Sequence, residues 1–177
     1  MERGAVAWWV RVVLAAGLTG LAVTAVAAPA ALAEESPWVT PLRLADAALA
    51  RKQYTAALRA LQDAHGAALG ARRWEGMVAV GDGYRRMGEV TGLRNTFDAK
   101  AREAYLVALT RARQEGSVDG ALQVAESFAV LGDGEMAVQC VRVAQRLAAR
   151  DAEAQATVRA FATRLADPTL TVQDLRR

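Results

Sequence analysis

The chain has 177 residues, of which 53% are apolar and 23% charged, so it can bury a core without disulfides. Its 22 basic and 19 acidic side chains give a formal net charge of +3 with no basic block, which argues against a nucleic-acid-binding protein. The only cysteine, Cys140, excludes an intramolecular disulfide. With the only histidine, His65, it cannot supply a His/Cys metal site.

The first 33 residues have the layout of a cleaved secretory signal peptide. Arg3 and Arg11 precede an uncharged run at 12–33, which ends in the small-x-small motif Ala31-Leu32-Ala33. Without this segment the chain keeps 20 basic and 18 acidic side chains. We therefore expect a periplasmic or secreted protein, and the Ala- and Arg-rich, Lys-poor composition favours a bacterial envelope. The alternative is an uncleaved inner-membrane anchor, since 22 uncharged residues can span a bilayer.

Helical patterns follow a linker at 34–40 and continue to residue 166, with no strand pattern between them. The expected helices cover residues 41–50, 55–69, 74–87, 96–114, 118–131, 135–149 and 151–165. Thr40, Asn95 or Thr96, and Ser117 are the expected N-caps, Asp151 is expected to open the last helix, and Gly88 is expected to end the third helix. The polar tail at 167–177 is expected to be flexible.

Three stretches of this helical region repeat one another. In each, a small residue is followed by a second residue three positions later, a turn, and then two alanines seven positions apart with a hydrophobic residue between them. The units read Ala45, Ala48, Lys52, Ala57, Leu61, Ala64; Gly81, Tyr84, Gly88, Ala101, Tyr105, Ala108; and Ala125, Phe128, Gly132, Ala137, Val141, Ala144. The offset is 36 residues, apart from eight extra residues at 90–97 in the second unit. Such a period predicts stacked helix pairs.

The pattern resembles the tetratricopeptide repeat, whose units carry a small residue, an aromatic, a turn glycine and two alanines in the second helix. The resemblance covers 38–151 and implies an all-α fold of three antiparallel helix pairs in a right-handed array. The sequence departs from the family in its period, its insert, its lack of a proline near the end of each unit, and Ala48 in the aromatic position. A related helix-pair array is therefore the other possibility.

The last expected helix has the pattern of a cap for such an array. Val158, Phe161 and Leu165 share one of its faces, which can cover the apolar end of the last pair. Trp38 and Trp74 lie 36 residues apart and are expected to pack at the starts of first helices.

In a tetratricopeptide array the first helix of each pair lines a concave groove. The columns expected there are apolar (Leu42, Val78, Leu122) and acidic (Asp46, Asp82, Glu126), with Arg85 interrupting the acidic one. Such a groove would bind a partner segment that carries Lys or Arg. The other interpretation is a solvated helix face that is acidic in three places.

Motifs that would indicate an enzyme are weak. Gly81-Asp82-Gly83 and Gly132-Asp133-Gly134 follow no strand and lack the rest of a phosphate-binding motif. His65 lies near a predicted helix end, and Cys140 lies in a column of small residues. We expect no catalytic residues, metal or cofactor. The sequence predicts an exported protein-interaction module, an adaptor or assembly factor; the alternative is a helical bundle that carries a small apolar ligand or lipid, with the insert at 90–97 as its lid.

Overall fold

The computed structural model describes residues 36–166, which belong to one compact unit, so the predicted signal peptide and tail lie outside the described residues. The helices are α1 (Val39–Ala50), α2 (Tyr54–Ala71), α3 (Trp74–Thr91), α4 (Arg94–Glu115), α5 (Val118–Val130), α6 (Gly134–Leu147) and α7 (Ala152–Leu165), with a short 3-10 turn, Ala148–Arg150, before α7. No strand occurs between residues 36 and 166. The prediction of an all-α fold with seven helices is confirmed for this part of the chain.

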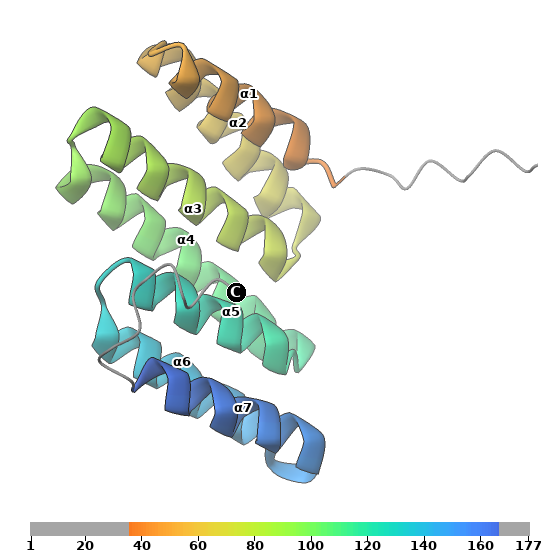
Figure 1. Ribbon diagram of the computed structural model, residues 1–177. Coiled ribbons are helices and arrows are strands. Elements are labelled where there is room, and N and C mark those ends of the chain that lie inside the picture. Colours follow the sequence, from red (N-terminus) through yellow and green to blue (C-terminus); the bar gives the residue numbers. More distant parts are fainter. Residues whose placement is uncertain (1–35, 167–177) are drawn as a thin grey trace, which may run out of the picture. The chain divides into compact units, whose positions relative to one another are not determined.

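Successive helices form antiparallel pairs, α1 with α2, α3 with α4, and α5 with α6 (Figure 1). Each second helix also packs on the first helix of the next pair, so α2 contacts α3 and α4 contacts α5. The first helices contact one another in succession, from α1 through α3 and α5 to α7. As predicted, α7 packs against the last pair, with Val158 and Phe161 buried.

Three helix starts are capped by side chains. The Ser117 hydroxyl accepts from the Gly120 N–H at 2.9 Å, and an Asp133 carboxylate oxygen accepts from the Met136 N–H at 3.1 Å. Asp151 accepts from the N–H groups of Glu153 and Ala154. Each cap satisfies a backbone donor that has no partner within its helix. The predicted cap Ser117 is thus confirmed, and Asp151, expected to open the last helix, lies just before it as its cap.

The predicted starts of α1 and α4 are wrong by two residues. Helix α1 begins at Val39, because Pro41 then lies in the first turn, where its missing N–H is not needed. Helix α4 begins at Arg94 after Leu93, which makes no side-chain cap bond. There, the hydroxyl of Thr91 accepts from the Leu93 N–H at 3.3 Å and donates to the Met87 carbonyl at 2.7 Å.

Gly88 does not end α3, which corrects the prediction. The left-handed residues between paired helices are Lys52 (φ 58°), Gly92 (φ 75°) and Gly132 (φ 86°), and the second helix begins two residues after each. The eight extra residues are therefore one added turn at the end of α3 and one at the start of α4. The insert at 90–97, a lid in the alternative interpretation, is not a loop, because all of it except residues 92 and 93 is helical.

The added turns explain the role of Gly88. A Cβ atom at this position would lie 3.1 Å from the Phe97 Cβ and 3.3 Å from the Arg94 Cα. These distances are tighter than ordinary contacts, so the missing side chain lets the start of α4 lie against α3.

The two alanine columns of the repeat have the same environment in all three units. Ala57, Ala101 and Ala137 are fully buried, and so are the second alanines of each unit, Ala64, Ala108 and Ala144. A Cβ atom on Gly81 would overlap the ring of Tyr105, so this glycine allows the close approach of α3 and α4. The small residues therefore recur where backbones approach closely, as the sequence predicts.

The two tryptophans repeat a second contact, between neighbouring pairs. Trp38 packs over Gly76, where a Cβ atom would lie 2.8 Å from the indole Cδ2. Trp74 packs over Gly120 in the same way, at 2.9 Å from its Cε2. Both indoles are buried, so the prediction that they pack at the starts of first helices is confirmed.

Candidate interaction surface of the first helices

The predicted apolar column does not form an open stripe. Val78 and Leu122 are only 2% and 7% exposed and belong to the core. Leu42 is partly buried and reaches Gly83 on α3, where a Cβ atom would lie 3.4 Å from the Leu42 Cδ2. The reason is that successive first helices contact one another, so side chains between them are covered. These three residues build the surface from beneath and offer little area to a partner.

The first acid of the predicted acidic column, Asp46 on α1, is paired across to α3. The guanidinium of Arg86 donates to its carboxylate from Nη2 at 3.0 and 3.3 Å and from Nε at 3.2 Å. The two side chains are 51% and 39% exposed, so the pair contributes about 0–1 kcal/mol to stability. A charged partner can therefore displace one member of this pair at low cost.

The second acid, Asp82, points inward. Its carboxylate accepts a hydrogen bond from the Tyr105 hydroxyl at 2.7 Å. Burial, together with the charge and hydrogen bond of Asp82, raises the pKa of Tyr105 far above its usual range, so the phenol remains a donor. Asp82 thus ties α3 to α4 and is half-buried.

Arg85 is a buried charge on α3, only 7% exposed. Its Nη1 lies 2.5 Å from a carboxylate oxygen of Glu89, one turn on, while its Nε has no hydrogen-bond partner among the described residues. The guanidinium also acts on Tyr105, whose pKa it lowers by a smaller amount than burial and Asp82 raise it. The predicted interruption of the acidic column therefore lies beneath the surface, in a cluster formed by Asp82, Arg85, Glu89 and Tyr105.

The third acid, Glu126, is half-buried on α5 and is not a free carboxylate. The surface of the first helices thus combines exposed charge on α1 and α3 with half-buried acids on α3 and α5. The pairing of Asp46 with Arg86 could have been found from the sequence, because Arg86 lies one unit and one further turn along the chain.

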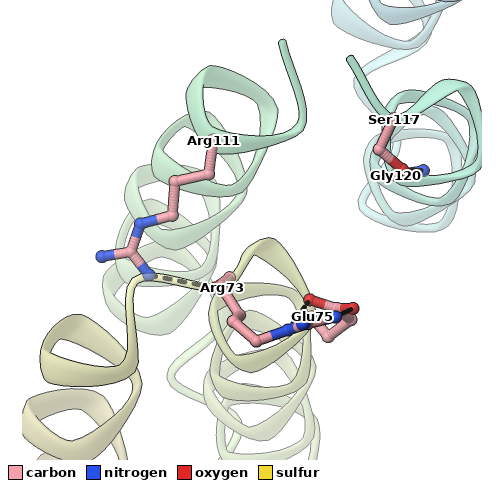
Figure 2. A network of polar contacts seen from close by, with 5 residues as sticks. All are labelled: Arg73, Glu75, Arg111, Ser117 and Gly120. Atoms are coloured by element: carbon pink, nitrogen blue, oxygen red, sulfur yellow. Dashed lines mark hydrogen bonds and ion pairs between the residues drawn. The ribbon is translucent and has the colours of Figure 1, made fainter. Parts of the chain in front are cut away.

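A polar network at the opposite ends of these helices fixes the step from the first pair to the second (Figure 2). Arg111 on α4 donates from Nη1 to the carbonyls of Ala68 and Arg73, at 2.9 and 3.0 Å, and from Nη2 to that of Leu69 at 3.2 Å. These carbonyls lie at the end of α2 and just after it, where intrahelical donors are missing. Burial lowers the pKa of Arg111, although it stays charged. This network has a structural role.

The remaining reactive side chains are packed rather than exposed. Burial raises the pKa of Cys140 to about 12, which leaves its thiol protonated and unreactive. His65 lies edge-on to Tyr84, with ring centroids 6.1 Å apart, and burial lowers its pKa. Between residues 36 and 166, no group of three His, Cys, Asp or Glu side chains could hold a metal ion. None of the helices in that range has the length and apolar character to cross a bilayer.

Comparison with protein-family models, curated proteins and solved structures found no match to this chain. The functional argument therefore depends on the repeated packing and on the chemistry of the surfaces that this packing forms.

Proposed function

We propose that this chain is an exported protein-interaction module, a tetratricopeptide-like, right-handed array that binds a segment of a partner protein on its first helices. One observation supports this most strongly: α1, α3, α5 and α7 contact one another in succession, so one face is built from the three first helices and the capping helix. Helix-pair arrays offer such faces to extended or helical segments of other proteins. The module acts as an adaptor or assembly factor of a bacterial envelope.

The charges on this face suggest which segment it binds. Asp46 is exposed and held only by a surface ion pair, and Glu126 lies two pairs further along. A partner segment with Lys or Arg can replace Arg86 beside Asp46, because exchange of one exposed pair for another costs little free energy. The spacing between the first helices, and so between these acids, is set by the packing of Leu42, Val78 and Leu122.

The second candidate function, carriage of a small apolar ligand or lipid, is favoured by one observation. An open apolar groove of about 270 Å³ lies between α6 and α7. Ligand sites usually have volumes of about 300–1,000 Å³ and enclose most of the ligand surface. The groove is smaller than this and open to solvent, so partner binding is the better-supported function.

Photo-cross-linking from the first helices tests the proposal. A photoreactive residue is placed at Asp46 on α1, and a matched one at Asp63, an exposed acid on α2. We expect a protein partner to be captured from Asp46 and identified by mass spectrometry, while Asp63 captures little. Equal capture from both positions, or capture of nothing but lipid, would count against the proposal.

A further inference from the structure

An apolar groove lies at the last junction of the array, between α6 and α7. It is lined by Val138, Val141, Arg142 and Gln145 on the α6 side and by Ala162 and Leu165 on the α7 side. Gln145 also lines a neighbouring hollow of about 210 Å³, together with Val158 and Arg159. The two hollows share this residue and so lie next to each other, and we call the pair the α6–α7 groove.

One repeat column holds a smaller side chain at this last junction, between α6 and α7, than at the two earlier ones. In this column Leu61 fills the first junction, between α2 and α3. A Cβ atom on Gly83 would lie 2.5 Å from the leucine Cδ2 there. Tyr105 fills the second junction, with its ring 5.5 Å from that of Phe128. At the third junction the column holds the smaller Val141, which is buried, at 6% exposed, and lines the groove.

The walls of the groove are apolar but its edges are basic. Val138 is 46% exposed. In the second unit the same column holds a charged residue instead, Arg102, which is paired with Asp133. Arg142 and Arg159 are exposed and make no ion pair with any residue between 36 and 166. From Gly134 to Ala166 there are five arginines against three acids, the reverse of the acidic columns on the first helices.

We propose that the α6–α7 groove is a second docking site, for an acidic amphipathic segment of a partner protein. The segment buries apolar side chains against Val138, Ala162 and Leu165, and its Asp or Glu side chains pair with Arg142 and Arg159. Since α6 has 14 residues and rises about 1.5 Å per residue, a helical segment of similar length fits it. With opposite charge preferences at its two sites, the module can hold two different partners together, which goes beyond the function proposed above.

A selection of displayed random 14-residue peptides on the full chain, as the cell processes it, tests this site. We expect enriched peptides to carry apolar residues at helical spacings together with an excess of Asp and Glu. Their affinity should fall at least tenfold with Arg142→Glu/Arg159→Glu, which changes only exposed side chains, and with Ala162→Phe, which fills the groove. Asp46→Lys, on the first helices, should leave it unchanged, and this separates failure here from failure of the proposed function.

Thermal unfolding confirms that each variant is folded, and the charge-reversal variant keeps the test valid if Ala162→Phe does not fold. Several results would overturn the proposal: selection of no peptide, selected peptides without acids, or affinities that neither variant changes. It would also be overturned if a fluorescent fatty acid takes the groove, if the groove variants abolish self-association in sedimentation, or if peptides bind only after deletion of 167–177. Those last results would assign the groove to an apolar ligand, a second copy or the chain's own tail.

Discussion

The first two junctions of this array and its last one are built from the same columns but are filled differently. Leu61 and Tyr105 reach across to the next first helix and meet a glycine or an aromatic ring there. Val141, in the same column, is shorter and lines the α6–α7 groove while remaining buried. Protein interiors are close-packed, so the space left at the last junction indicates that its side chains meet a requirement other than packing. The contrast separates the part of the array that holds the fold together from the part that is available to a partner.

Truncation of a residue in the column of Leu61, Tyr105 and Val141 should have the largest effect at a filled junction. Tyr105→Ala deletes a fully buried ring and leaves Asp82 without its hydrogen-bond donor, so we expect a loss of about 4 kcal/mol in the free energy of unfolding. Val141→Ala removes two buried carbons beside an existing groove and should cost about 2 kcal/mol. Urea denaturation measures both. Equal losses would remove the distinction between the junctions.

Adding a methyl group at a filled junction should also destabilise the protein. A Cβ atom on Gly120 would lie 2.8 Å from the Ala112 Cβ and 2.9 Å from the Trp74 ring, so Gly120→Ala should cost about 2 kcal/mol. Gly66→Ala is the control, because Gly66 lies inside α2 with nothing near its missing side chain. It should stabilise the protein by about 0.5–1 kcal/mol. Thermal midpoints that shift in the same direction would contradict the close contact.

At the open junction, a larger side chain should stabilise. Ala162→Leu extends apolar atoms into the α6–α7 groove, and we expect a gain of about 0.5–1 kcal/mol from the added apolar burial. The comparison is Ala125→Leu, at a fully buried column position, which should lose about 2 kcal/mol through overpacking. Calorimetry of both variants checks the opposite signs, and a loss for Ala162→Leu would mean that the groove is already filled.

The smallest effect should appear as a pH dependence at the first junction. Burial lowers the pKa of His65, with Glu103 opposing this and Lys100 and Arg111 adding to it. The unfolded chain therefore binds a proton at His65 more readily than the folded chain does. The contribution of His65 to the free energy of unfolding is complete above the ordinary histidine pKa of about 6.5 and declines as the pH falls below that value. Denaturation at pH 7.5 and 5.5 should show this decline, and His65→Gln should reduce it. A decline unchanged in the variant would assign it to other groups.

The sequence was sufficient for the helical content, the repeat and some of the helix starts, because these depend on local spacing. Small residues at Ala57, Ala101 and Ala137 indicated where backbones approach, and Ser117 and Asp151 indicated where helices begin. The end of α3 was predicted wrongly, because Gly88 allows the close approach of α4 and the turn lies one turn later, at Gly92.

The candidate surface was harder to predict than the fold. Spacing placed Val78 and Leu122 on the first helices, but their burial depends on how closely neighbouring first helices pack. The inward bond of Asp82 likewise needs the Tyr105 hydroxyl from another helix. The α6–α7 groove depends on the summed volumes of the side chains at one junction, and no short sequence motif encodes this sum.

The affinity of the cross-linked partner for two charge-reversal variants tests the central claim, that the first helices bind it. Asp46→Lys and Asp63→Lys change the charge equally, one on a first helix and one on a second helix. Titration calorimetry should show binding at least tenfold weaker for Asp46→Lys and within twofold of the original for Asp63→Lys. Equal affinities, or a larger loss for Asp63→Lys, would contradict the account.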